Sequence, residues 1–366
     1  MRLQLIAAAA AAAWWAAAPA RAQTVADARS ELSGALRVYA DDDRVTVVTP
    51  SAAAVVPLAE RWLVDVNVAV DVVSAASVDV VTAASPVDVR ERRYEVDAGA
   101  AFAPRADREL RVRAIGSHEN DYDALRASLG GRVEVARRNA TIDVAYTYAA
   151  DRAGMRTDPD FERTRTGHEL ALSFTQIVDR RTYVDLVAEA HRYDGYHASP
   201  YRSVPVVDPA SPQILRVDEV TPAVRTSAAA LVRVRRALEW PARWYGRADY
   251  RLYVDDWDVV SHTAEAGAIV PLADRAELGV RLRGYAQSAA EFYRPVYQTP
   301  APAFRTRDRK LGPMRSLYAD WTIRVGWFIA SAGVARWWYL DDPAQSGRLA
   351  VIASAGVAVP LAEEDR

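Results

Sequence analysis

The sequence predicts an all-β protein, a single antiparallel transmembrane β-barrel of about sixteen strands. Two observations lead to this prediction. Apolar and charged residues alternate through most of the chain, so that around Val96, for example, Tyr94 and Val96 share one face and Glu95 the other. The connections between these stretches alternate between short turns and longer, more acidic loops. Short periplasmic turns and longer extracellular loops are the layout of outer-membrane barrels.

The stretches between these connections define the predicted strands, and an even number of strands places both ends of the chain in the periplasm. The predicted strands cover residues 33–40, 44–57, 60–74, 90–104, 108–118, 122–137, 139–150, 163–178, 181–193, 220–238, 241–255, 258–271, 275–291, 310–326, 328–340 and 347–361. The longer loops include residues 150–163, 194–219 and 291–309.

Aromatic residues gather at both ends of the predicted strands, as expected for two girdles at the membrane interfaces. By the short turns lie Trp62, Phe102, Trp240, Trp244, Trp327 and Phe328, and by the long loops lie Tyr146, Tyr148, Trp257, Trp337 and Tyr339. In a soluble periplasmic β-protein, which is the alternative fold, the same rings would more often fill one central core.

The first residues indicate export. Residues 1–22 combine Arg2, an Ala-rich apolar core and the cleavage site Ala20-Arg21-Ala22, which is the pattern of a secretory signal peptide. The mature chain, residues 23–366, is then expected to form one barrel domain. Beyond residue 22 no apolar run approaches twenty residues, so the chain would cross a membrane only as a closed barrel. We expect it in the outer membrane of a Gram-negative cell, in contact with outer-membrane lipid.

Composition argues against several functions. The chain has no cysteine, which excludes a disulfide framework, a thiolate nucleophile and Cys-ligated metal. Its net charge of −2 gives no general attraction to nucleic acid. The five histidines show no metal-ligand spacing, and no catalytic motif such as G-x-S-x-G is present. We therefore expect no catalytic residues, no metal and no cofactor.

Charged residues line the predicted inward faces of the strands. One interpretation is a hydrated wall whose charges pair across neighbouring strands, and the other is a pathway for an ion or small solute whose arginines attract anions. The candidate residues for the lumen and its constriction are Asp65, Asp71, Asp79, Asp88, Arg111, Arg113, Arg243, Arg247, Arg251, Arg281 and Arg283.

An eight-residue phrase occurs twice in succession, as Val70–Ser77 and Val78–Ser85, and Pro86 follows. The first copy continues an alternating strand to about Ser74. The second copy lies where the chain must turn back, and two interpretations are open. It either extends the hairpin beyond the membrane or folds inward as a constriction, with Asp79 and Asp88 facing the pore.

Several segments, this phrase above all, resemble a bacterial family of uncharacterised proteins, the domain-of-unknown-function family numbered 3570. The resemblance rests on Asp42–Pro50, Val70–Pro86, Phe174–Thr182, Ser199–Arg202 with Val204-Pro205, Tyr250–Asp258 and Asp308–Pro313. It implies a secreted, all-β, outer-membrane protein and no known activity, cofactor or catalytic residue. The chain departs from many barrels at its end, Val359–Arg366, which lacks the terminal aromatic residue recognised by the insertion machinery.

The expected function is that of a channel or porin-like pore for a small solute or ion. A plugged barrel that binds a partner through its long loops, or serves as an assembly component of the outer membrane, is the alternative from another class.

Overall fold

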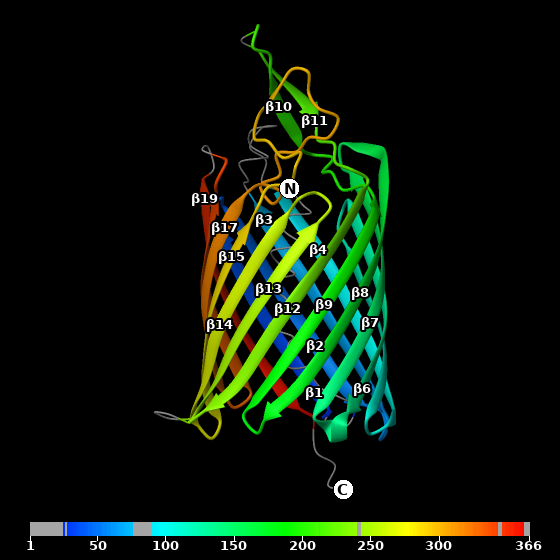
Figure 1. Cartoon of the computed structure of the whole chain (residues 1–366), viewed down its shortest axis with the longest axis vertical. Coiled ribbons are helices and arrows are strands. Elements are labelled where there is room, and N and C mark those ends of the chain that lie inside the picture. The colour runs from blue at the N-terminus through cyan, green and yellow to red at the C-terminus, as the bar shows by residue number, and fades with distance from the viewer. Residues whose placement is uncertain are drawn as a thin grey trace.

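The chain folds into a closed antiparallel β-barrel, seen in a computed structural model that describes residue 25 and residues 28–75, 89–211, 213–239, 243–342 and 346–361. Within these residues sixteen strands form the barrel, and β1 closes it by pairing with β19 from Glu31↔Pro360 to Asp41↔Ala350 (Figure 1). The prediction of an all-β, sixteen-stranded barrel is confirmed. No helix in the described part of the chain is long and apolar enough to cross a membrane.

The barrel strands follow one another around the wall in chain order. They are β1 (Glu31–Asp41), β2 (Val45–Pro57), β3 (Trp62–Ala75), β4 (Val89–Arg105), β5 (Arg108–His118), β6 (Tyr122–Val135), β7 (Ala140–Met155), β8 (Asp158–Asp179), β9 (Thr182–Gly195), β12 (Val224–Leu238), β13 (Trp244–Asp255), β14 (Val260–Ala273), β15 (Ala276–Gln287), β17 (Met314–Val325), β18 (Phe328–Tyr339) and β19 (Gly347–Pro360).

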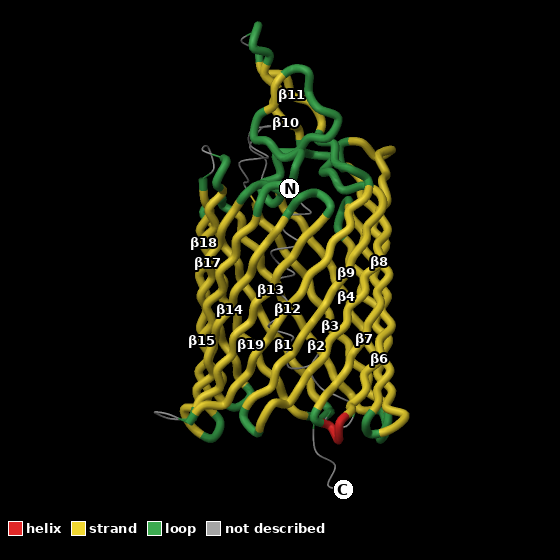
Figure 2. Tube along the Cα trace, viewed as in Figure 1, coloured by secondary structure: helices red, strands yellow, loops and turns green. Residues whose placement is uncertain are grey.

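The connections divide into two kinds at the two ends of the barrel (Figure 2). Short turns join the strands at one end, and one of them contains the 3-10 turn η1 (Ala136–Arg138). The longer connections lie at the other end. Two of these contain the remaining strands, β10 (Ser203–Val207), β11 (Ile214–Asp218) and β16 (Tyr297–Gln298), which form a separate three-stranded sheet in the order β11-β10-β16.

The predicted loop at residues 150–163 is instead part of a long hairpin. The ladder between β7 and β8 continues through Ala153↔Arg163 and Gly154↔Glu162, and the chain turns only between Met155 and Asp158. The prediction of a loop is wrong, because charged residues do not by themselves mark a loop in this segment. Charged residues are compatible with strands that extend beyond the membrane, since both faces are then hydrated.

The two faces of the wall carry different side chains, which is the reason for the two-residue period of the sequence. Large apolar side chains are exposed on the outer face, among them Leu36, Val66, Val96, Leu125, Leu172, Leu282 and Trp321. At the short-turn end Trp62 and Phe102 are cross-strand partners with ring centroids 4.6 Å apart.

Three predicted members of the girdle by the long loops lie elsewhere. Trp257 is buried under the loops of the barrel mouth. Trp337 and Tyr339 share the face of the inward residue Ser331, and the exposed ring at this level belongs to Trp338. Alternation shows which residues of a strand share a face, but not which face points to the lipid. Because Trp337 and Trp338 are adjacent, either of them could be the outward residue of this strand.

Candidate functional site

The inner wall of the barrel over β3 to β7 is filled by charged side chains that pair across strands. Arg113 on β5 donates hydrogen bonds to Asp97 on β4 and, over 2.7 Å, to Asp65 on β3. It reaches β3 by passing over Gly99, where a Cβ would lie 2.8 Å from the Arg113 guanidinium. The wall is therefore built so that one arginine can serve two carboxylates.

A second arginine of β5, Arg111, also crosses a glycine of the neighbouring strand, but it extends toward β6 and β7. Arg111 passes over Gly130 of β6 and donates to Asp143 on β7. These glycines leave space on the middle strand for a long side chain that pairs two strands away.

Similar pairs line the wall on the opposite side, over β9 to β17. Arg281 donates to Asp320 over 2.6 Å and lies 3.8 Å from Glu265, which also accepts a hydrogen bond from Arg247. A separate pair continues this charged lining toward β9, where Arg251 donates to Glu189 over 2.8 Å.

The other predicted lumen residues differ in their surroundings. Asp71 accepts hydrogen bonds from Thr49 and Arg93. Arg283 is partly buried on the inner face of β15. Arg243 is exposed at the short-turn end, with its guanidinium 5.6 Å from the ring centroid of Tyr245.

Asp79 and Asp88 lie outside the described residues, together with the second copy of the repeat, and so does the predicted signal peptide, residues 1–22. Alternation alone identified the arginines of the inner wall, but not which carboxylate each of them pairs with. The acceptors Asp143, Glu265 and Asp320 were missed as candidates.

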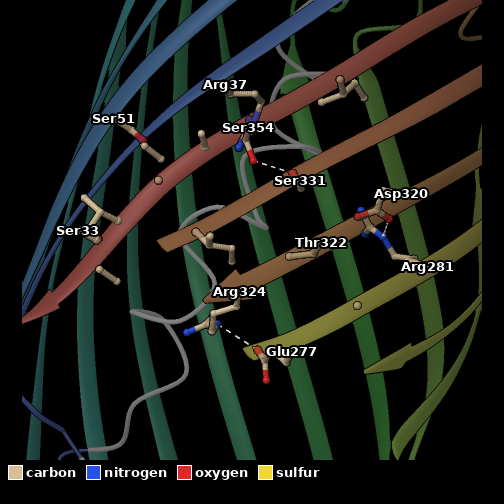
Figure 3. A pocket seen from close by; sticks show the side chains of 18 of the residues that line it. Ser33, Arg37, Ser51, Glu277, Arg281, Asp320, Thr322, Arg324, Ser331 and Ser354 are labelled. Atoms are coloured by element: carbon tan, nitrogen blue, oxygen red, sulfur yellow. Dashed lines mark hydrogen bonds and ion pairs between the residues drawn. The ribbon is translucent and has the colours of Figure 1, made fainter. Parts of the chain in front are cut away.

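A third part of the wall, formed mainly by β1, β2, β18 and β19, is lined by small side chains. A cavity of about 410 Å³ lies against it (Figure 3). Here the hydroxyl groups of Ser331 and Ser354 lie 2.7 Å apart. The small lining residues are Ser33, Ala35, Ser51, Ala53, Ser331 and Ser354. Among the described residues, this part of the wall thus leaves open space, whereas long paired side chains line the parts described above.

Charged side chains border this cavity, among them two ion pairs and Arg37. Arg324 donates to Glu277 over 3.1 Å, and Arg281 pairs with Asp320 as described above (Figure 3). Arg37 lines the cavity on β1, next to Ser354 in the register of β1 and β19. At the short-turn end, on the side of β2 to β5, Val25 packs against Val55, Leu63 and Ala101 and fills the space between them.

The mouth of the barrel carries a folded structure made from two loops, residues 196–223 and 288–313, which we call the cap. Its sheet joins the loops, because β10 pairs with β11 in the first loop and with β16 in the second. Val220 and Arg305 form a further antiparallel bridge between the loops. Val204, Val206 and Tyr297 are buried together in a small hydrophobic core. The sequence predicted both loops but not their joint fold.

A buried polar cluster lies at the centre of the cap. Arg202 forms ion pairs with Glu219 at 2.9 Å and with Asp308 at 3.1 Å, and Glu219 also accepts a hydrogen bond from Thr306. Burial would raise the pKa of Asp308, but the charges of Arg202 and Lys310 lower it below its ordinary value. The cluster joins the two loops through charged contacts withdrawn from water.

One further group of carboxylates lies at the rim. Oxygen atoms of Glu91, Glu119 and Asp121 lie within 4.8 Å of one another, close enough to hold a metal ion. Arg93 lies 3.9 Å from Glu119, and the Tyr201 hydroxyl donates a hydrogen bond to Asp121. The protein therefore balances part of this charge itself.

His197, at the start of the cap, gives the cap a predicted response to acid. Burial, with the charges of Arg165 and Arg225, lowers its pKa to about 4, below the ordinary value of 6.5, and its ring lies edge-on to Trp257. An opened state binds the proton more readily, so this stabilisation is complete above pH 6.5 and is lost as the pH falls toward 4. Hydrogen exchange of residues 196–223, corrected for its intrinsic pH dependence, should show more opening at pH 5 than at pH 7.5. The same pH response in His197→Gln would contradict this assignment.

A closed barrel with an apolar outer face and a charged inner face is the architecture of outer-membrane β-barrel proteins. The family of proteins of unknown function DUF3570 matches residues 150–328, which confirms the family resemblance of this sequence over that part of the chain. A search of curated proteins found no match.

Solved structures of outer-membrane proteins are similar in fold. CdiB from Acinetobacter baumannii gives a TM-score of 0.56 at 7% identity, over 91% of this chain and 60% of that chain. A bacterial polysaccharide outer membrane secretin gives 0.48 at 11% identity, over 90% and 98%. The siderophore receptor PirA from Pseudomonas aeruginosa gives 0.46 at 11% identity, over 92% and 62%. This chain spans less than two thirds of the length of CdiB and PirA, and at these identities the likeness concerns the fold alone.

Proposed function

We propose that this protein is an outer-membrane channel through which small hydrophilic solutes or ions pass along the inner wall formed by β1, β2, β18 and β19. The observation that carries the proposal is the cavity of about 410 Å³ beside that wall. The serine, alanine and glycine residues in its lining leave room for a solute, and the serine hydroxyl groups can replace part of its hydration. A sixteen-stranded barrel is of the size that can hold an aqueous channel.

The ion pairs on the remaining walls support the same proposal. Arginines that each hold one or two carboxylates keep long side chains against the wall and out of the open space. The charged groups that face the solute are then largely neutralised in pairs, with Arg37 as a further cationic group at the cavity. Passage of this kind requires no covalent step, and the proposal includes no catalytic residue and no cofactor.

The test is conductance of the purified protein in a planar bilayer, with two tryptophan variants on adjacent residues of β1. Ala35 lines the cavity, whereas the neighbouring Leu36 is exposed on the outer face. In Ala35→Trp a ring of roughly 150–250 Å² would stand in the passage, so we expect the single-channel conductance to fall by about half or more. Leu36→Trp should conduct like the unmodified protein, because an outward ring faces lipid.

Two outcomes would contradict the proposal. One is a bilayer that stays sealed at every voltage with correctly folded protein. The other is equal conductance of the Ala35→Trp and Leu36→Trp variants, which would place the passage elsewhere.

A further inference from the structure

Four of the positions at which the cap meets the rim are spaced evenly around the barrel. In the strand order of the wall, four strands separate the β5–β6 turn from the loop between β9 and β12, and four more lead to the loop between β15 and β17. Another four lead to the β1–β2 turn. The cap contacts all four points, so it extends across the mouth rather than along one side of it.

Two of the four positions are the roots of the cap, where its loops leave the barrel. At the root between β15 and β17, Ala290 and Tyr293 are buried with Trp257 and Val259 from the neighbouring β13–β14 connection. At the root between β9 and β12, the Tyr196 backbone donates to the Thr164 carbonyl over 2.9 Å. Covalent continuity and apolar burial hold this half of the cap in place.

At the two remaining positions, on the other half of the rim, polar and charged side chains make the contacts. At the first, the Tyr201 hydroxyl donates to Asp121 and accepts from the backbone N–H of Arg156 over 2.7 Å. At the second, the Arg309 guanidinium lies 3.5 Å from an Asp43 oxygen and 4.8 Å from the ring centroid of Tyr339. We call these two contacts the latches. The Arg309 and Asp43 side chains are only 11% and 19% exposed, but Asp43 keeps its 2.7 Å ion pair with Arg348 when Arg309 moves away. At the other latch, water can replace the Tyr201 hydroxyl at Asp121. Both contacts can therefore open without leaving Asp43 unpaired.

The interior of the cap favours its motion as one body. Its sheet, its hydrophobic core around Val204 and its buried cluster around Glu219 all join one loop to the other. Separating the loops would expose these groups, and breaking a buried ion pair is strongly unfavourable. Releasing the latches exposes none of them.

We propose that the cap is a gate over the mouth of the barrel, hinged at the roots of its two loops and latched at Tyr201–Asp121 and Arg309–Asp43. With the latches formed, the cap spans the mouth. With the latches released, it tilts as a unit toward the β9–β15 side and uncovers the wall along which solute passes. As a control of passage, this inference rests on the proposed channel function, but the motion itself can be measured separately.

The experiment uses the absence of native cysteines, which allows two spin labels to be placed at will. Labels at Ala210→Cys, an exposed position at the tip of the cap, and His118→Cys, an exposed position on the latch side of the rim, report the distance between cap and rim. The test variant is Tyr201→Phe with Arg309→Gln, which removes both latches and leaves the Asp43–Arg348 pair intact. The control is Tyr250→Phe, which removes a hydroxyl group from the outer wall, where it bonds to His262.

In lipid, we expect the test variant to gain a second, longer distance population that the unmodified protein and the Tyr250→Phe control show weakly. Superimposable distance distributions in all three proteins would overturn the gate. Conductance of the same three proteins separates the two proposals. If the test variant shows the longer distance but none of the three proteins conducts, the cap moves and the channel proposal is wrong. If the proteins conduct but their distance distributions are the same, the channel proposal stands and the gate is wrong.

Discussion

Replacing Arg113 by alanine should lower the free energy of unfolding by about 3–5 kcal/mol, because removal of one partner leaves buried charges uncompensated. Arg113 is the shared partner of Asp65 and Asp97, and the Asp97 side chain is fully inaccessible to solvent. Burial of the two carboxylates without their cation would force them to take up protons or draw water into the wall. The measurement is a denaturant titration of the refolded barrel in detergent or lipid, followed by the change of electrophoretic mobility on unfolding.

The matched control lies on the same strand. Arg108 forms a 3.9 Å ion pair with Asp107 at the short-turn end, where both side chains are about half exposed, and such pairs contribute roughly 0–1 kcal/mol. The variant Arg113→Met combined with Asp65→Asn and Asp97→Asn should regain most of the stability, because no unpaired charge remains. If Arg113→Ala and Arg108→Ala were equally stable, the inner-wall network would contribute little to folding.

The barrel could be predicted from sequence because one physical constraint acts on every strand. A residue of the wall faces either lipid or the lumen, and successive residues must alternate, so Val66 and Asn67 already reveal their faces. The order of the strands required no further information, since hairpin connections place neighbours in sequence side by side. Only local signals were needed, and this is why the number of strands was correct.

The cap depends on contacts that no local pattern encodes. Val220 and Arg305 pair across a long separation in sequence, and β16 consists of Tyr297 and Gln298 alone. In β10, Pro205 argues against the middle strand of a sheet, because proline cannot donate to the ladder. This strand tolerates it since β16 pairs only with Val206 and Val207, beyond the proline.

The pairing of the lumen arginines could be predicted from the sequence only in part. Alternation placed Arg111 and Arg113 on the inner face, but register and reach decide which carboxylate each one finds. Gly99 and Gly130 were the available signal. A glycine on the inner face of a strand, flanked by strands that carry an arginine and an acid, marks a place where a long side chain crosses.

The orientation of the wall gives the second large expected effect. Val66 is exposed on the outer face in the middle of β3, and the adjacent Asn67 lines the cavity. An arginine at the lipid midplane costs about 2–4 kcal/mol, so Val66→Arg should lower the folded yield in lipid vesicles and the midpoint of urea unfolding. Asn67→Arg should fold with the yield of the unmodified protein, because water and neighbouring carboxylates are available inside the barrel. Equal tolerance of arginine at both positions would show that the outer face of β3 does not contact lipid. The assignment of the outer face of the barrel to the membrane would then be wrong.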